Sequence, residues 1–168
     1  MSDARDPAEA AFVDALFGED ELGVVVRAHI HIEAKLLELL ELLVADPKYL
    51  ERMDLGFAQR VNLAIALGLK SEHASGLSAL GTLRNAFAHR LDVQLSEDRV
   101  NNLYAALSSS DKEVVHLAYN RTNDQMGRSD APPFDKLSVK EHFILISVAL
   151  RAMLITTINE IRARRTRI

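Results

Sequence analysis

Apolar residues recur along the chain at intervals of three and four, the spacing that places them on one face of an α-helix. Serine, aspartate, glycine and proline residues separate these segments and mark where helices begin and end. No segment shows the strict alternation of a half-buried strand. The pattern therefore predicts an all-α fold, a helical bundle of about six to seven helices, over residues 7–17, 20–45, 57–67, 71–88, 96–107, 110–120 and 138–164.

Capping residues set several of these boundaries. Asp6 and Pro7 are a typical helix start, and Gly68 is a typical C-cap. Ser110 and Ser138 each precede a glutamate by three residues, which is the spacing of a capping box. A further helical turn is expected within 48–56.

The pattern also indicates one domain over residues 1–168. Its N-terminal helix falls within 1–19, and a long loop rich in Asn, Asp, Gly, Ser and Pro covers 121–137. The last helix is apolar on every side from Phe143 to Leu150, so it is expected at the centre of the bundle or partly in a subunit interface. That run alone is too short to span a bilayer, and we expect no membrane segment.

The amino-acid composition and charge exclude several kinds of functional site. The 168 residues include no cysteine, which excludes disulfides, thiolate zinc sites and cysteine nucleophiles. The first residues lack the pattern of a signal peptide, so a cytoplasmic location is expected. The net charge of −4 gives no general attraction for nucleic acid. The basic tail, 162–168, contacts phosphates or an acidic partner, or complements the dipole of its own helix.

Charged residues fall on apolar faces in two of the predicted helices. Arg84 projects within an apolar arc, whereas Asn85 and His89 share a neighbouring polar face. In the second helix, His29 and Glu33 lie within an apolar stripe that also contains Leu22, Val25, Ile32, Leu36, Leu40 and Leu43. A buried charge needs a partner, so we expect Glu33 to pair with Arg84, with His29 close by.

This predicted cluster has two interpretations. It is either an ion pair that fixes the packing of two helices, or a cationic site in which Arg84 steadies a phosphate and His89 moves a proton. Residues five apart on a straight helix point about 140° away from each other. Arg84 and His89 can therefore serve one site only if the helix bends near Ala88 or if a dimer axis brings two copies together.

The string Leu83-Arg84-Asn85-Ala86-Phe87-Ala88-His89 resembles the motif of the HEPN superfamily. Residues 55–70, followed by Ser71 and Glu72, are similar to bacterial mannitol repressors, which carry a comparable Leu-Gly opening and a following helix that closes on a histidine. This second resemblance covers about residues 20–165 and is strongest at 55–90. It implies an all-helical regulatory protein that acts through a protein partner, since no helix-turn-helix reader is evident.

The HEPN resemblance implies a different activity. It implies metal-independent RNA cleavage by a homodimer, with His89 as acid or base, Arg84 on the phosphate and Asn85 in a positioning role. The motif is often eroded in mannitol repressors and is intact here, which favours a ribonuclease. We therefore expect a mannitol-repressor-like regulator of HEPN type, with an endoribonuclease or a non-catalytic helical interaction module as alternatives.

Other chemistries have less support. His29 and His31 diverge on a helix, and no His-Glu-x-x-His motif is present, so no metal site and no cofactor are expected. We interpret His73, His116 and His142 as surface or capping residues. A phosphate-binding glycine-rich loop and a nucleophile elbow are both missing from the sequence.

Overall fold

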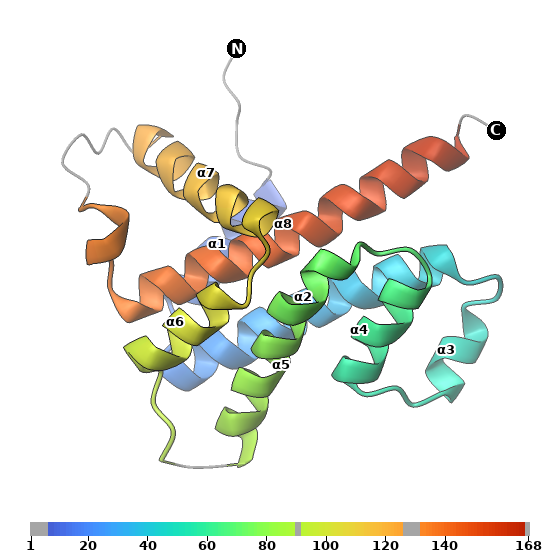
Figure 1. The fold of residues 1–168 in the computed structure, drawn as a ribbon, viewed down its shortest axis with the longest axis horizontal. Helices are drawn as coiled ribbons and strands as arrows, with labels where there is room; N and C mark the ends of the chain where they lie inside the picture. Colours follow the sequence, from blue (N-terminus) through green and yellow to red (C-terminus); the bar gives the residue numbers. More distant parts are fainter. Residues whose placement is uncertain (1–6, 90–91, 126–131, 167–168) are drawn as a thin grey trace.

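The computed structural model describes residues 7–89, 92–125 and 132–166, and no strand occurs among them. Eight α-helices and two short 3₁₀ turns make up this part of the chain (Figure 1). The prediction of an all-α bundle is confirmed. In chain order, the elements are α1 (Pro7–Phe17), α2 (Glu21–Leu43), α3 (Lys48–Arg52), α4 (Phe57–Ala66), η1 (Ser71–His73), α5 (Ala74–His89), α6 (Glu97–Ala105), α7 (Ser109–Gln125), η2 (Phe134–Lys136) and α8 (Val139–Arg165).

The two longest helices, α2 and α8, form the centre of the bundle and run side by side in the same direction (Figure 1). Near the start of α8, the Lys140 ammonium donates to the carbonyl oxygen of Phe17 at 2.8 Å. Near its end, Arg162 donates to Glu38 at 2.8 Å. Between these contacts, nearly all of the Phe143–Leu150 run is buried, as its uninterrupted apolar character predicts.

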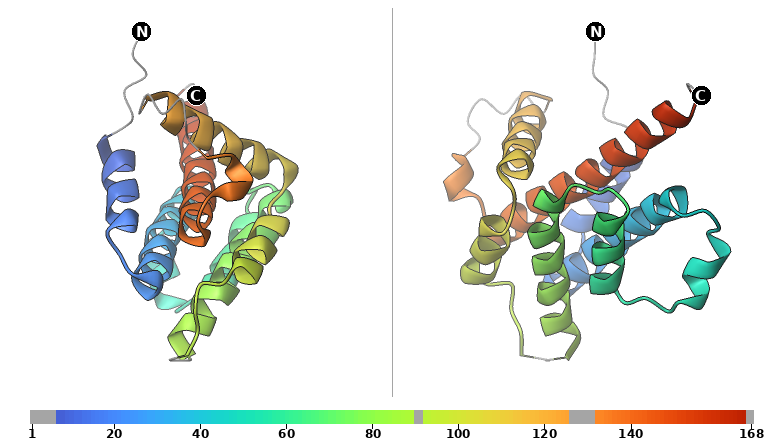
Figure 2. Two further views of the ribbon diagram at one scale, coloured as in Figure 1. Left: turned by 90° about the vertical axis from the view of Figure 1, so that its left-hand side faces the viewer. Right: turned by 45° about the vertical axis from the view of Figure 1, so that its right-hand side comes forward.

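The remaining helices cover this central pair from different sides. Helices α4 and α5 pack against α2 and against each other, whereas α6 and α7 pack against α8. Helix α1 contacts both central helices (Figure 2). This arrangement leaves α2 between α8 on one side and the α4–α5 pair on the other, which positions the site described below.

Helix α8 is long and apolar enough to cross a membrane by length and composition alone. The most apolar stretch has a mean hydropathy of 1.7, and 56% of it is buried inside the bundle. Core helices of globular folds pass the same test, so this feature is weak evidence for a membrane span. The uninterrupted apolar run is too short to indicate a span because it ends at Arg151, whereas α8 as a whole is long and apolar enough.

The predicted loop over 121–137 is wrong at both ends. Helix α7 continues to Gln125, and Phe134 lies in the η2 turn. The η2 turn is held by ring contacts, because Phe134 packs against the rings of four residues: Tyr104, His116, Tyr119 and His142. Residues 126–131 of the expected loop lie outside the described residues.

Several predicted helix boundaries are confirmed, and others differ from the prediction. Ser138 and Glu141 form the expected capping box, and Gly68 has the positive φ of 118° that a C-cap glycine adopts. Helix α7 begins earlier than expected, because the hydroxyl of Ser108 accepts the N–H of Asp111 at 3.1 Å. Asp6, the expected cap of the first helix, lies outside the described residues, as do Arg167 and Ile168 of the basic tail.

Burial follows the predicted stripes with two exceptions. Leu22 is 50% exposed although it belongs to the predicted stripe of α2, because it lies in the first turn of that helix. Ala88, which belongs to the predicted apolar arc around Arg84, is exposed in the last turn of α5. Helix ends extend past their packing partners, so helical periodicity alone overestimates burial there.

Candidate functional site

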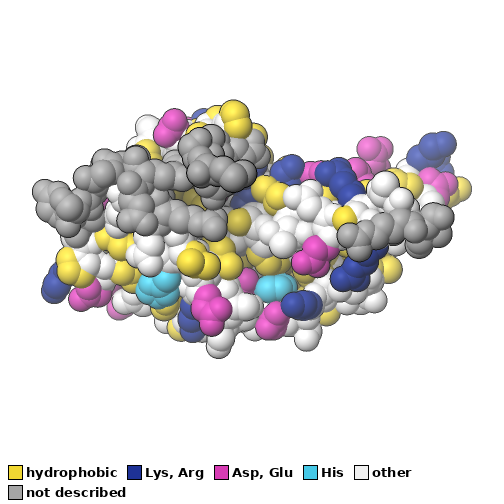
Figure 3. Space-filling view, turned by 90° about the horizontal axis from the view of Figure 1, so that it is seen from above, with side chains coloured by type: hydrophobic (Ala, Val, Ile, Leu, Met, Phe, Trp, Pro, Cys, Tyr) yellow, Lys and Arg dark blue, Asp and Glu magenta, His cyan; other side chains and the backbone are white. Residues whose placement is uncertain are grey.

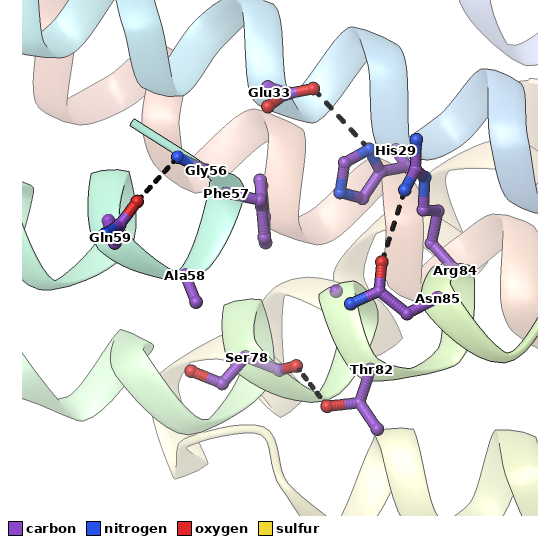
Figure 4. A pocket seen from close by; sticks show the side chains of 11 residues that line it. His29, Glu33, Gly56, Phe57, Ala58, Gln59, Ser78, Thr82, Arg84 and Asn85 are labelled. Carbon is purple, nitrogen blue, oxygen red and sulfur yellow. Dashed lines mark hydrogen bonds and ion pairs between the residues drawn. The ribbon is translucent and has the colours of Figure 1, made fainter. Parts of the chain in front are cut away.

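A pocket of about 600 Å³ opens between α2, α4 and α5 (Figure 4). Such a volume suits a small ligand. Four of the five candidate residues line it, namely His29, Glu33, Arg84 and Asn85. The other lining residues come from the start of α4 and the middle of α5: Gly56, Phe57, Ala58, Gln59, Ser78, Gly81 and Thr82.

Close packing of α4 on α5 shapes the pocket. The Phe57 ring lies over Gly81, where an added Cβ would come within 2.7 Å of the ring atom Cδ1. A side chain at position 81 would therefore push Phe57 away. On its other side, the Phe57 ring packs against the imidazole of His29, with 4.4 Å between ring centroids. Gly81 thus lets Phe57 form the wall that joins α5 to α2.

The expected ion pair between Glu33 and Arg84 is not formed. Instead, Arg60 of α4 donates to Glu33 at 2.9 Å. The second carboxylate oxygen of Glu33 lies 3.7 Å from Nδ1 of His29 (Figure 4). The prediction failed because α4 packs beside α2 and brings a closer cation, a tertiary contact that the periodicity of two helices does not contain.

Arg84 therefore has no carboxylate within 4 Å among the described residues. Its Nη1 donates to the Oδ1 of Asn85 at 3.2 Å (Figure 4). This hydrogen bond uses the acceptor of the Asn85 amide and leaves the NH₂ group of that amide as a donor. The pair presents several N–H donors beside the pocket, a chemistry suited to a phosphate or carboxylate.

His29 is the buried titratable group of the pocket, with only 4% of its surface exposed. Burial lowers its pKa, the Glu33 carboxylate partly offsets this effect, and the Arg84 guanidinium lowers the pKa further. The neutral imidazole is therefore favoured. A neutral ring can accept a proton from a ligand or donate one N–H to it.

His89 is not among the residues that line the pocket. It is the last residue of α5 and is exposed, one turn beyond the exposed Asn85. Helix α5 is continuous through this region, so the bend required to bring Arg84 and His89 together is not seen. Arg84, Asn85 and His29 thus line one pocket, whereas His89, one turn beyond Asn85 on α5, lies outside it.

Sequence reasoning missed the contribution of α4. Phe57, Ala58 and Gln59 line the pocket from the first turn of that helix. The signal available was Gly56 followed three residues later by Gln59, because the Gln59 side chain accepts the Gly56 N–H at 2.8 Å. That spacing marks a helix start but does not show which helix lies opposite.

A second histidine, His73, is buried, although we interpret it from the sequence as a surface or capping residue. His73 is 7% exposed, and its Nδ1 lies 3.0 Å from Oδ2 of Asp111. Asp111 also accepts from the hydroxyl of Ser108 at 2.7 Å. Burial alone raises the pKa of Asp111, but the hydrogen bonds from His73 and Ser108 outweigh it, so the pKa lies below its usual value. This pair ties η1 to the start of α7.

The described residues contain no group of three or more His, Cys, Asp or Glu side chains placed to hold a metal ion. Comparison with known proteins adds no assignment, because no family model, curated protein or solved structure matches the chain. The interpretation of the pocket therefore depends on its own geometry and on the motif resemblance.

Proposed function

We propose that the chain is a mannitol-repressor-like regulatory protein of HEPN type, located in the cytoplasm, which acts through a protein partner. The all-α bundle is compatible with this class, and the resemblance is strongest at 55–90, the part of the chain that builds two walls of the pocket. Acidic and basic side chains are interspersed on the face shown in Figure 3, which does not favour direct DNA reading through a broad basic surface.

The single observation that carries the proposal is the state of Arg84. If the cluster only fixed helix packing, Arg84 would be bound to Glu33. Glu33 is bound to Arg60 instead, and within the part of the chain that the structure describes the guanidinium of Arg84 donates one hydrogen bond, to the amide of Asn85 at the edge of a pocket. An arginine held in this way is available to bind an anionic ligand or partner.

A gene-replacement experiment tests this proposal. Deletion of the gene is expected to change the abundance of a defined set of transcripts, and the wild-type chain is expected to restore them. Arg84→Gln should fail to restore them. Arg99→Gln is the matched control, because Arg99 is also partly exposed and does not line the pocket. Equal rescue by Arg84→Gln, or no transcript change on deletion, would contradict the proposal.

A metal-independent endoribonuclease is the second candidate, favoured by the exposure of His89 next to the Arg84–Asn85 pair. Because Arg84 and His89 point apart on one continuous α5, this activity requires a homodimer in which His89 of one copy faces Arg84 of the other.

This activity is tested by incubating RNA with the wild type and with His89→Ala in the presence of a chelator. Loss of an acid–base group is expected to slow cleavage by about 10²-fold or more. His116→Ala is the control, because His116 is also exposed and lies on α7, outside the pocket. Equal cleavage by all three proteins, or no cleavage by any, would exclude the ribonuclease.

A further inference from the structure

A charged side chain is buried in the middle of the central helix α8. Arg151 is 8% exposed, and its Nε has no hydrogen-bond partner. Its guanidinium also forms no ion pair with any residue that the structure describes. An unpaired charge in a protein interior is costly. The bundle therefore holds a guanidinium that is short of an anionic partner.

Helix α1 covers this guanidinium. The ring of Phe12 lies over it, with 4.8 Å between Cζ of Arg151 and the ring centroid. The same ring packs against the imidazole of His31 on α2, with 4.8 Å between ring centroids. This cation–π contact offsets part of the cost of burial, but the ring offers no carboxylate oxygen to the guanidinium N–H groups. Another molecule can therefore reach Arg151 only when α1 moves away.

Few buried side chains hold α1 to the bundle. Phe12 and Leu16 are the buried residues among its 11. The helix lies at the outer edge of the bundle beside α2 and α8 (Figure 2), and Lys140 donates to the carbonyl oxygen of Phe17 at its C-terminal end. Segments with few buried apolar contacts open at a low cost in free energy. Displacement of α1 would leave α2 packed on α8 and would uncover Arg151.

The groove beneath α1, between α2 and α8, is electropositive. Burial lowers the pKa of His31, and the positive charges of Arg151, Arg27 and Lys35 lower it further. Arg27 and Lys35 are each paired with a glutamate, whereas Arg151 has no such partner in the described part of the chain. A positive charge therefore remains in the groove, and it favours an acidic partner.

We propose that this groove is the docking site for an acidic amphipathic helix of a protein partner, and that α1 covers the groove until the partner displaces it. Phe12 and Leu16 lie four residues apart, the spacing with which a helix inserts its side chains into a groove. The partner helix places an apolar side chain at the position of Leu16. It places a carboxylate at the position of Phe12, where the carboxylate pairs with Arg151.

This groove and the Arg84 pocket lie on opposite faces of α2. His29 lines the pocket, and His31 contacts Phe12 of α1. Residues two apart on a helix point about 160° away from each other. The inference rests on the proposed function in naming the place where a protein partner docks, but it needs no contribution from Arg84.

The test measures the binding of three synthetic peptides to the full chain by fluorescence anisotropy. Each peptide has the sequence of residues 7–19: one is unchanged, one carries Phe12→Glu and one carries Phe12→Gln. The Phe12→Glu peptide is expected to bind at least about tenfold more tightly than the Phe12→Gln peptide, on the scale of one charge-assisted contact. Its binding should also speed hydrogen exchange at the amides of Val13 and Leu16 in the chain, because the peptide takes the place of α1.

Two variants of the full chain locate the contact. Arg151→Met removes the charge and keeps a long side chain, so the preference for the Phe12→Glu peptide is expected to vanish. The thermal midpoint of Arg151→Met should equal or exceed that of the wild type, because the variant no longer buries an unpaired charge. Phe12→Ala weakens the cover and is expected to tighten binding of the Phe12→Glu peptide about tenfold or more. Arg164→Gln, at an exposed position of α8, is the control.

The outcomes separate the possible occupants of the groove. Tightest binding of the unchanged peptide would assign the groove to α1 of a second copy and overturn the proposal. Equal affinities of the Phe12→Glu and Phe12→Gln peptides would also overturn it, as would no binding to either the wild type or Phe12→Ala. Unchanged exchange in α1, or a midpoint of Arg151→Met far below that of the wild type, would likewise contradict it.

The transcript experiment keeps this inference separate from the proposed function. Failure of Arg84→Gln to restore transcripts, together with no peptide binding, would refute the docking groove alone. Full rescue by Arg84→Gln, together with Arg151-dependent peptide binding, would refute the role of the Arg84 pocket and leave the groove standing.

Discussion

Two buried histidines of this chain lie in opposite kinds of environment. His73 is hydrogen-bonded to Asp111 at 3.0 Å, and Asp111 is itself 1% exposed and bonded to Ser108. His29 lies 3.7 Å from Glu33, whose side chain is 30% exposed and bound to Arg60. The first pair is closed and satisfied, whereas the second lines a pocket.

The buried His73–Asp111 pair is a structural contact, whereas the partly exposed His29–Glu33 pair belongs to a candidate site. A buried carboxylate left without its partner is very costly, so the His73–Asp111 pair must be satisfied for the fold to form. A partly exposed pair contributes little to stability, because water screens it. Glu33 and Arg84 can therefore serve binding with little effect on folding.

The largest expected effect comes from Asp111→Ala. This change removes the acceptor of His73 and Ser108 in the interior, and it is expected to lower the free energy of unfolding by about 3 kcal/mol. Glu33→Gln, the matched change in the pocket, is expected to cost less than about 1 kcal/mol. Urea denaturation measures both. Equal losses in the two variants would remove the distinction between the two histidine environments.

A smaller loss is expected for Gly81→Ala. The new Cβ would come within 2.7 Å of the Phe57 ring and displace the wall of the pocket. Overpacking of this kind costs about 1–3 kcal/mol, and the better helix propensity of alanine offsets up to about 1 kcal/mol. The net destabilisation should be about 1 kcal/mol, measured by denaturation. A more stable variant would show that Phe57 is not held against α5.

His29 is expected to make the stability of the folded protein depend on pH. Burial lowers its pKa in the folded protein, so the unfolded chain binds its proton more readily. The stability from the neutral ring is present above the unfolded pKa of about 6.5 and is lost as the pH falls below it. The pKa of His31 is also lowered, again chiefly by burial, and contributes in the same direction.

Replacement of His29 by Gln is therefore expected to reduce the loss of stability between about pH 7.5 and pH 5.5. The lowered pKa of Asp111 acts at more acidic pH, because the stability it gives is lost only as the pH falls below about 4. Thermal unfolding at a series of pH values measures the slope. An unchanged slope in the variant would contradict the assignment to His29.

The smallest effect on stability is expected for Arg84→Gln. Arg84 makes one hydrogen bond to an exposed neighbour and no ion pair with a described residue, so the free energy of unfolding should change by less than about 0.5 kcal/mol. Denaturation beside Arg99→Gln is the measurement. A loss of about 2 kcal/mol or more would restore the interpretation of Arg84 as a packing element.

The sequence predicted the helices better than their contacts. Apolar periodicity and capping residues placed most of the helices, because both signals are local. Helix periodicity also identified His29 and Arg84 as polar groups on packed faces. It could not show that Arg60 reaches Glu33, or that Asp111 reaches His73 across 38 positions. Those contacts depend on how separate helices pack, which one helix at a time does not reveal.

Because the sequence does not show how separate helices pack, it also revealed only some of the residues that line the pocket. Asn85 and His89 were correctly placed on one face, because they are one turn apart on α5. The contribution of Phe57 and Ala58 depends on the position of α4 against α5, and Gly81 marks that contact only once Phe57 is seen above it. The motif therefore located Arg84 and Asn85, and the apolar stripe of α2 located His29 and Glu33. The wall formed by the start of α4 followed from neither pattern.

The most direct test compares the thermal unfolding midpoints of the wild type, Arg84→Gln and Asp111→Asn, with and without inorganic phosphate. A ligand that binds only the folded state raises the midpoint. Phosphate is expected to raise the midpoint of the wild type. Asp111→Asn is expected to unfold at a lower temperature and still be stabilised by phosphate. Arg84→Gln is expected to keep the wild-type midpoint and lose the stabilisation by phosphate. If Arg84→Gln unfolds at as low a temperature as Asp111→Asn, and phosphate leaves the midpoint of the wild type unchanged, the Arg84 pocket is not a binding site.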